Sequence, residues 1–355
     1  MERMLDNIKD YTLPELEAWL GERGERPFRA RQVFQWLYQH RATEFAQMSS
    51  LGKELRATLA AHFHPGNLAL AARAESADGS TKFAFALADG RQIETVLMPN
   101  LTHYTVCVST QVGCAMGCDF CATAQMGLVR NLSPGEIVQQ VVEAARAIDG
   151  DKLVRNVVFM GMGEPLHNFD ALKAALEILQ SDHGFGLSAR RLTVSTSGLV
   201  PAIRRYAREG LRANLAVSLN AVDDTVRTRL MPVNRRWNIA ALLDACREVP
   251  AENRYRITFE YVLLAGLTDR LEDAHRLVRL LHGFKCKVNL IPYNAHPDSA
   301  YRAPTLEHAH AFQRILLDRG VLATIRISKG QDIQAACGQL VRQAPPQAGT
   351  VLAAG

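Results

Sequence analysis

An alternation of strand and helix patterns along most of the chain constrains its fold more than any other feature. From Thr105 onward, short apolar segments typical of buried strands recur, and amphipathic segments separate them. The strand patterns cover 105–109, 154–160, 192–195, 213–219, 257–264, 287–291 and, last, 323–327. The helical patterns between them include 134–147, 171–179, 200–209 and 271–281. Because strand–helix–strand units build parallel sheets with outer helices, we predict an α/β fold with a closed or partial barrel.

The first hundred residues follow a different pattern. Residues 10–64 have helical periodicity, and Thr12 begins a capping-box signature for the first helix. Residues 82–98 alternate around an Asp89-Gly90 turn, which predicts a β-hairpin. We therefore divide the chain into a helical N-terminal accessory domain, a hairpin extension, a barrel core and a C-terminal tail, with bounds 1–80, 81–103, 104–328 and 329–355.

Composition is typical of a globular protein from a reducing compartment. Apolar residues make up 48% of the 355, enough for a large core, and no apolar run is long enough to predict a membrane span. The N-terminus lacks the apolar stretch of a signal peptide. Several of the seven cysteines gather around one metal-like pattern, which is unlike a disulfide framework. We expect a cytoplasmic monomer that does not associate with membranes.

Positive charge is concentrated in one part of the chain. The net charge is +5, yet residues 190–236 contain ten arginines against Glu209, Asp223 and Asp224, a local surplus of +7. Arginine suits bidentate contacts with phosphate, so the segment is a candidate nucleic-acid contact. Solvated helix faces explain many basic segments equally well, and both interpretations stay open on this feature alone.

Three closely spaced cysteines, Cys114, Cys118 and Cys121, follow the first barrel strand with the spacing C-x3-C-x2-C. That position is the carboxyl end of the sheet, where ligand sites of such folds gather. Three thiolates can hold three irons of a four-iron cluster and leave the fourth iron open for a small molecule. A structural zinc ion and an electron-transfer cluster both require a fourth protein ligand, and the sequence around the three cysteines offers no obvious fourth ligand. Inert buried cysteines are the remaining alternative.

Polar residues also follow the later strands. Gly163 and Glu164 follow the second strand, and the remaining candidates are Ser195, Ser218, Leu219, Asn220 and Asn294. Hydroxyl and amide groups at strand ends suit hydrogen bonds to a ribose or an adenine edge, and Glu164 suits a ligand ammonium. Taken singly, each is more typical of a helix cap or turn. Together they line one rim of the predicted barrel.

These motifs resemble a known family. The cysteine spacing with Phe120 resembles the radical S-adenosylmethionine (SAM) superfamily, and the segment Gly161-Met162-Gly163-Glu164-Pro165 is similar to its "GGEP" element, with Met162 as a departure. Two further cysteine segments, 107–114 and 332–340, look like those of the RlmN/Cfr radical SAM RNA methyltransferases, and the likeness covers about 10 to 342. The resemblance implies a partial (β/α)6 radical SAM barrel, a [4Fe-4S] cluster and SAM as cofactors.

The resemblance also implies roles for three further residues. Carbon 2 of adenine is electrophilic, so it resists a methyl group from the SAM sulfonium. The family uses two SAM molecules: one methylates a cysteine, which by position is Cys337, and the second yields a radical that activates that methyl group. Release of the product then requires a disulfide between Cys337 and Cys107. Cys337 lies in a Gly-containing tail that we expect to be flexible. Glu94 is a candidate base, because a carboxylate in a partly dry cleft can titrate near neutrality.

The implied substrates are 23S rRNA and tRNA, methylated at C2 of an adenosine, with an electron donor such as flavodoxin or ferredoxin. A Cfr-type enzyme, which methylates C8 of the same rRNA adenosine, is the nearest alternative. A non-catalytic RNA-binding protein with a structural metal is an alternative of another class.

Overall fold

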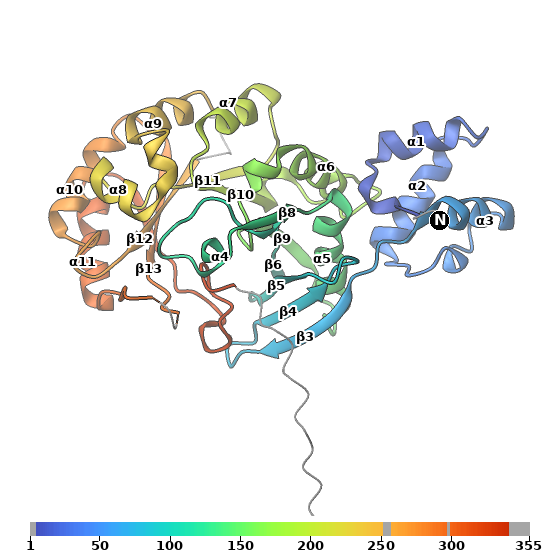
Figure 1. The fold of residues 1–355 in the computed structure, drawn as a ribbon, viewed down its shortest axis with the longest axis horizontal. Helices are drawn as coiled ribbons and strands as arrows, with labels where there is room; N and C mark the ends of the chain where they lie inside the picture. Colours follow the sequence, from blue (N-terminus) through green and yellow to red (C-terminus); the bar gives the residue numbers. More distant parts are fainter. Residues whose placement is uncertain (1–4, 251–256, 297–298, 341–355) are drawn as a thin grey trace, which may run out of the picture.

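The computed structural model describes residues 5–250, 257–296 and 299–340, and its central feature is a ten-stranded sheet (Figure 1). The strand order is β14-β13-β12-β11-β10-β9-β6-β5-β4-β3. The first seven in that order are parallel: β14 (Leu322–Ile325), β13 (Cys286–Pro292), β12 (Ile257–Leu263), β11 (Asn214–Ser218), β10 (Leu192–Thr196), β9 (Val154–Phe159) and β6 (Tyr104–Cys107). Because β14 and β3 are separate edges, the barrel is partial. The predicted α/β class and barrel strands are confirmed.

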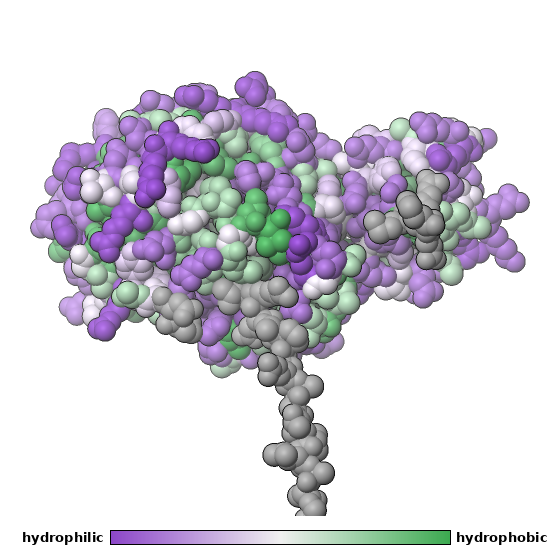
Figure 2. Space-filling model, in the orientation of Figure 1, coloured by the Kyte–Doolittle hydropathy of each residue, from purple (hydrophilic) through white to green (hydrophobic). Residues whose placement is uncertain are grey.

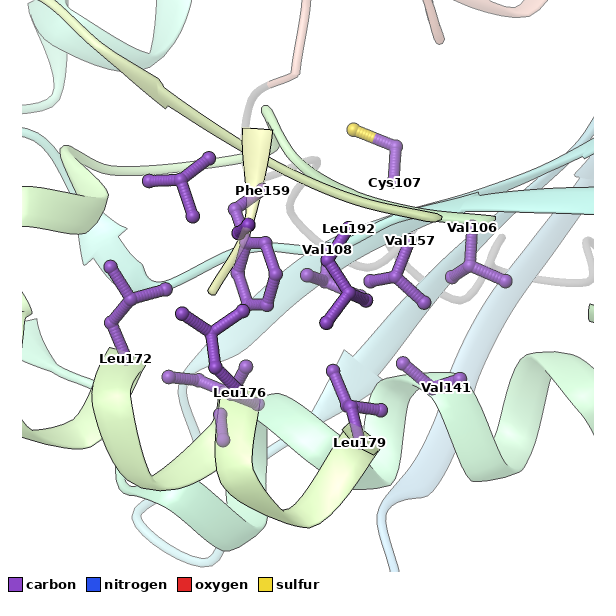
Figure 3. Close-up of a cluster of buried hydrophobic side chains, with 14 of the residues drawn as sticks. Val106, Cys107, Val108, Val141, Val157, Phe159, Leu172, Leu176, Leu179 and Leu192 are labelled. Carbon is purple, nitrogen blue, oxygen red and sulfur yellow. The ribbon is translucent and has the colours of Figure 1, made fainter. Parts of the chain in front are cut away.

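Helices in the connections cover the outer face of this sheet (Figure 1). They are α5 (Pro134–Arg146), α6 (Phe169–Gln180), α7 (Val200–Glu209), α8 (Asp224–Leu230), α9 (Ile239–Arg247), α10 (Leu271–Leu280) and α11 (Leu306–Asp318). In Figure 3, Val106 and Val108 point toward the outer helices, with Val106 above Val141 of α5, whereas Cys107 between them points to the opposite side. Alternation along β6 therefore buries two valines outside the barrel and turns a thiol toward its interior.

The N-terminal region is helical, as predicted, and is fastened to α5. It contains α1 (Leu13–Gly21), α2 (Phe28–Phe34) and α3 (Lys53–His62), with a short pairing of β1 (Asp6–Asn7) and β2 (Phe63–His64). The predicted capping box at Thr12 is present. At the start of α5, the Gly135 amide donates to Asp10 at 2.8 Å, and farther along Arg41 donates to the Ala145 carbonyl at 2.8 Å.

The extension beside the barrel has three antiparallel strands, so the predicted two-stranded hairpin over 81–103 is incomplete. The strands are β3 (Ala69–Glu75), β4 (Thr81–Ala86) and β5 (Gln92–Pro99), and β5 pairs with β6. Residues 69–75, assigned to the helical region 1–80, thus belong to the main sheet. Their side chains are nearly all exposed, so the apolar alternation that marks a half-buried strand is missing.

The loop after β6 carries the three cysteines. It is framed by β7 (Gln111–Gly113) and β8 (Leu128–Asn131), and α4 (Ala122–Gln125) lies between them. Figure 2 shows hydrophobic side chains at the surface over β8, where Leu128 and Val129 are exposed. The loop therefore lies close to the molecular surface. None of the helices in the described ranges is long and apolar enough to cross a membrane.

Candidate active site

A cavity of about 160 Å³ lies at the carboxyl ends of the parallel strands. The cysteine loop lines it from one side, and the ends of β9 to β13 line it from the other. The sequence-predicted residues that line it are Cys114, Cys118, Cys121, Gly163, Glu164, Ser195, Ser218, Asn220, Asn294 and Cys337. The structure thus brings into one cavity residues that the sequence offered at the ends of separate strands.

The path of the cysteine loop depends on a glycine. Gly113 has φ +76°, and a Cβ there would lie 1.9 Å from the Gly127 carbonyl oxygen, so no other residue fits. The Cys114 amide donates to the same oxygen at 2.9 Å, which closes the base of the loop. Cys121 precedes the first turn of α4. These contacts aim the three thiols at the cavity from a short, closed loop.

The three thiols line one cavity, an arrangement that suits the protein ligands of an iron–sulfur cluster. Within the described residues, no three His, Cys, Asp or Glu side chains converge as ligands of one ion. A four-iron cluster takes one thiolate per iron, so its ligands face a shared space without meeting at a point. Burial raises the pKa of all three thiols, so a bound metal is needed to hold them as thiolates.

The two glycines after β9 are required by the packing of this chain. A Cβ on Gly161 would lie 2.7 Å from the Val108 carbonyl oxygen. Gly163 has φ +105°, and a Cβ there would lie 2.6 Å from the Cβ of Gln111. Met162 between them is fully buried. Both glycines therefore pack closely against the residues that follow β6 and also line the main cavity.

Glu164 is held rigidly at the wall of the cavity. Its carboxylate accepts hydrogen bonds from the Ser197 amide at 2.7 Å and the Leu166 amide at 3.1 Å. Burial raises its pKa, and the hydrogen bonds from Ser197 and Thr196 oppose that rise. A buried, oriented carboxylate of this kind suits a ligand ammonium group, because the pair would restore the lost solvation.

The other rim residues fall into two groups. Ser195 donates to Glu260 at 3.2 Å, and Asn220, with φ +57°, accepts from the Val262 amide at 3.0 Å while facing the cavity. Leu219, in contrast, has its side chain in the hydrophobic core and does not line the cavity. Its backbone amide donates to the Glu260 carbonyl at 3.0 Å, so the prediction that Leu219 contacts the cofactor is not supported by its position.

A buried arginine fastens this rim from behind. The Arg227 guanidinium donates to the carbonyls of Leu219 at 3.0 Å, Ser197 at 2.9 Å and Ser218 at 3.1 Å. It also donates to Asn234 at 2.9 Å, and its side chain has no exposed surface. Burial lowers the pKa of Arg227 to about 10, which leaves it charged at neutral pH. Sequence analysis counted Arg227 only as one of ten basic residues.

Cys107 and Cys337 meet at a second, small cavity of about 20 Å³. Cys337 lines both this cavity and the larger one, so it lies between them. Burial and the neighbouring Cys337 raise the pKa of the Cys107 thiol, and the Arg326 guanidinium opposes that rise. Two thiols predicted from opposite ends of the barrel sequence therefore share one pocket next to the cysteine loop.

The segment around Cys337 is tied to the cysteine loop. The Ala122 amide donates to the Gly338 carbonyl at 2.8 Å, and the Thr123 hydroxyl donates to the Leu340 carbonyl at 2.5 Å. Asn294 donates to the Cys337 carbonyl at 3.2 Å. We predicted a flexible tail, but through Leu340 the tail is held by specific bonds; residues 341–355 lie outside the described residues.

A turn of the extension holds the same tail, and we call this contact the tail latch. Asp332 accepts from the Ser76 hydroxyl at 2.6 Å and the Ala77 amide at 3.0 Å. In return, Asp78 accepts from the Gly330 amide at 2.9 Å. Burial alone would raise the pKa of Asp78. The hydrogen bonds from Gly330 and Ser80 outweigh burial and lower this pKa to about 2. The latch is therefore ionised across the physiological pH range.

Glu94 lies beneath the tail and outside both cavities. It is 2% exposed, and its carboxylate is 3.1 Å from the Lys82 ammonium, which also donates to the Gln334 carbonyl at 3.2 Å. Neither cavity includes Glu94 in its walls. Its role as a base stays a prediction.

Two charged residues of the site went unnoticed in the sequence. Glu260 lines the main cavity and Arg326 the small one, and their charged groups are 3.5 Å apart. The signal for Glu260 was present, because polar Thr258 and Glu260 alternate with apolar neighbours along β12. Arg326 carried the same kind of signal, because polar Thr324 and Arg326 alternate with Ala323, Ile325 and Ile327 in the predicted strand.

The ten arginines of 190–236 do not form one surface. Arg227 is buried, and Arg204 and Arg205 pair with acidic side chains. Arg190 and Arg191 line the interior of the barrel at its other end. The interpretation as solvated helix faces holds for Arg204, Arg205 and Arg208 on α7 and for Arg229 on α8.

Two family models match the chain. The "Ribosomal RNA large subunit methyltransferase N-terminal domain" matches residues 6–64, and the "Radical SAM superfamily" matches residues 108–278. The first covers the helical N-terminal region, and the second covers the barrel from the cysteine loop through α10.

Similar proteins span nearly the whole chain. "Dual-specificity RNA methyltransferase RlmN 2" of Myxococcus xanthus is 52% identical over 98% of this chain and 93% of its own length. "Dual-specificity RNA methyltransferase RlmN" of Geobacter sulfurreducens is 49% identical over 96% of this chain and 93% of its own. The crystal structure of a radical SAM methyltransferase from Sphaerobacter thermophilus is 48% identical, with a TM-score of 0.89, and covers 94% of this chain and 98% of that one.

Proposed function

This chain belongs to the RlmN family of radical SAM RNA methyltransferases, and from that membership we propose that it methylates C2 of an adenosine in 23S rRNA and in tRNA. Its cofactors are a [4Fe-4S] cluster and SAM. The observation that carries the proposal is the shared pocket of Cys107 and Cys337, next to the cavity lined by the three other cysteines.

The pocket supports a two-thiol mechanism. When bound, the cluster and SAM supply a radical that removes one hydrogen atom from a methyl group on the Cys337 sulfur. The carbon radical on that sulfur then bonds to adenine C2, so the RNA is tied to the chain, and the adduct gives up its unpaired electron to the oxidised cluster. After the proton on C2 leaves, the Cys107 thiolate bonds to the Cys337 sulfur; the sulfur–carbon bond breaks, its electron pair stays on the carbon, and that carbon takes up a proton to complete the methyl group. Two electrons and two protons must then restore both thiols.

The rim residues hold SAM in this proposal. Glu164 accepts hydrogen bonds from the methionyl ammonium, and Gly163 sets the backbone beside it. Ser195, Ser218 and Asn220 contact the nucleoside through side chains, whereas Leu219 anchors the end of β11 from the core. Asn294 already bonds the Cys337 carbonyl, so it also positions the methyl-carrying sulfur. Glu94, charged beside Lys82, is the candidate base for the proton on C2.

The mechanism needs partners that follow from its chemistry. RNA is the substrate, and one electron must reach the cluster from a donor for which a flavodoxin or ferredoxin is suited. We propose that the protein acts in the cytoplasm as a monomer.

The identity of the modified carbon tests the proposal. We expect 2-methyladenosine when the reconstituted protein, SAM and reductant act on 23S rRNA fragments or tRNA, as measured by mass spectrometry of the digested RNA. Production of 8-methyladenosine alone would assign the protein to the Cfr type. A colourless protein that binds zinc and leaves SAM intact would be the non-catalytic alternative.

Replacement of Cys107 by alanine should trap the reaction halfway. Without the second thiol, the sulfur–carbon bond of the adduct has no attacking group, so RNA should accumulate covalently on Cys337. Gel mobility in denaturant and peptide mass spectrometry would measure the adduct. Cys246→Ala is the matched control, because Cys246 is buried on α9 and lines neither cavity. Release of free methylated RNA by Cys107→Ala at the normal rate contradicts the assigned role.

A further inference from the structure

The barrel is hollow at its amino-terminal end as well. A cavity of about 670 Å³ opens there, and residues of all seven parallel strands line it. Its walls are largely polar, with Thr105, Asn156, Thr193, Asn214, Thr258, Lys287 and Asn289 contributed by six of those strands. In a closed (β/α)8 barrel, bulky branched side chains fill this space. Here the space is large enough for a nucleotide.

Alternation along the strands makes the interior hollow. On β10, Leu192 and Val194 are fully buried against the outer helices, whereas Thr193 between them faces inward and is half-buried. On β11, Leu215 is buried outward while Asn214 faces the cavity. Short polar side chains inside the barrel cannot pack into an apolar core, so the interior stays available to a polar ligand.

The cavity leads to the two reactive thiols. Met160, just after β9, lines this cavity, the main cavity and the small pocket of Cys107 and Cys337. Arg326 lines both this cavity and the small pocket. A molecule in the amino-terminal cavity is therefore separated from the Cys337 sulfur by the Met160 side chain and the Arg326 guanidinium.

The walls of the cavity are positively charged. Arg190, Arg191, Lys287 and Arg326 line it, and none of the described residues in its walls is acidic. Of these four, Arg326 alone makes an ion pair with a described acidic residue. Arg191 donates to Asn156 at 3.2 Å. The pKa of His103 is lowered mainly by burial and then by the positive charge of Arg191. Three cations without acidic partners around an open polar cavity suit a polyanion.

We propose that RNA enters the barrel from the amino-terminal end of its strands. The phosphodiester backbone lies against Arg190, Arg191 and Lys287, and the target adenosine reaches past Met160 to the Cys337 sulfur. The inference rests on the proposed function. At the opposite end, the tail is bonded to the cysteine loop through Ala122 and Gly338, which covers that side of the thiols. Cations meet the phosphates, and the Asn and Thr side chains meet the ribose and base.

Charge reversal at the cavity mouth tests the proposed path. The variant Arg190→Glu/Lys287→Glu should bind a tRNA anticodon stem–loop at least about tenfold more weakly at low salt, with a shallower salt dependence, because phosphate contacts are lost. Fluorescence anisotropy over a salt series measures both, and SAM binding by equilibrium dialysis should be unchanged. The matched control is Arg208→Glu, an exposed arginine of α7 outside the cavity.

Two results would overturn the path: wild-type RNA affinity in the double variant, or an equal loss in Arg208→Glu, which would indicate a diffuse charge effect. RNA binding measures the path without methyl transfer. A wild-type protein that binds RNA through these cations but never methylates it would refute the proposed function and leave the path standing.

Blocking the interior separates the path from simple surface attraction. Thr193→Trp places a bulky side chain halfway along the cavity, away from the residues that line the main cavity. RNA methylation should be lost, while methylation of Cys337 by SAM, read by peptide mass spectrometry, should persist. RNA methylation at the wild-type rate in Thr193→Trp would show that adenosine arrives by another route.

Discussion

At the scale of single residues, Arg227 is the side chain on which the rim most depends. Its guanidinium satisfies three backbone carbonyls at the ends of two neighbouring strands, and it does so with no exposed surface. Burying a cation is costly, so such a residue persists only where its hydrogen bonds are all made. The arginine acts as a positioning residue, because it holds the residues that face the ligand and does not line the cavity.

Replacement of Arg227 by methionine should weaken SAM binding and lower stability together. The three carbonyls would lose their donor, and each unsatisfied buried group costs roughly 1 to 3 kcal/mol. We expect a lower Tm and a SAM Kd raised at least about tenfold, since 1.4 kcal/mol corresponds to that factor. Arg208→Met, exposed on α7, should change neither. An unchanged SAM Kd in Arg227→Met would refute the positioning role.

The same scale shows where sequence reasoning stops. The cysteines and Glu164 were found because their spacing is short-range and chemically specific. The role of Arg227 depends on carbonyls of Ser197 and Leu219, and no local pattern marks a side chain that will be buried against them. Leu219 is a residue that the sequence placed in the site and the structure does not. Its neighbours Ser218 and Asn220 face the cavity, whereas its own side chain enters the core.

At the scale of elements, the extension and the tail act as one unit. The turn between β3 and β4 holds the tail through the tail latch, and Lys82 on β4 bonds the Gln334 carbonyl. The barrel strands were predictable because alternation along each strand is a local signal. The latch was not, because Ser76 and Asp332 are 256 residues apart and neither carries a pattern of its own. Strand β3 was missed because its exposed side chains lack the apolar alternation of a half-buried strand.

Loss of the latch should release the methyl-carrying segment. Asp332→Ala removes the acceptor for Ser76 and Ala77, so Cys337 should react several-fold faster with iodoacetamide and RNA methylation should slow. Peptide mass spectrometry reports the alkylation, and kcat should fall with little change in KM for SAM. Asp89→Ala serves as the control. Asp89 lies in the turn between β4 and β5, and its carboxylate pairs with Arg91 and with Arg130 on β8, not with the tail. Equal alkylation rates in the two variants and wild type would mean that the latch does not hold the tail.

At the scale of the whole molecule, the N-terminal helices dock on the barrel through a buried lysine. Lys9 is fully buried and donates to the Pro65 carbonyl. Its pKa is lowered from an ordinary value of 10.5 to about 7, mainly by burial and also by the positive charge of Arg146, while the negative charge of Glu143 opposes both. Beside it, Gly135 leaves room for Asn7 and Asp10, because a Cβ would lie 2.5 and 2.9 Å from their side chains.

The buried lysine predicts a pH dependence of stability. Between about pH 7 and pH 10.5 the unfolded chain binds the Lys9 proton and the folded chain does not. The free energy of unfolding should therefore rise with pH in this window, by up to about 1.4 kcal/mol per unit, and the contribution should level off below pH 7. Lys9→Met should remove it, as measured by urea unfolding at pH 7 and pH 9. Lys53→Met, an exposed lysine of α3, should not. Identical pH profiles in Lys9→Met and wild type would contradict the assignment.

The positions of Cys107 and Cys337 have a consequence for the chain as a polymer. Cys107 ends the first barrel strand and Cys337 follows the last, so a bond between their sulfurs turns the intervening chain into one covalent ring. Closing a ring of this size removes conformational freedom from the unfolded chain, which corresponds to roughly 5 kcal/mol in a chain-entropy treatment. In the proposed mechanism each catalytic round therefore alternates between a linear and a cyclic molecule. The oxidised, cyclic form should then resist heat and protease better than the reduced, linear form.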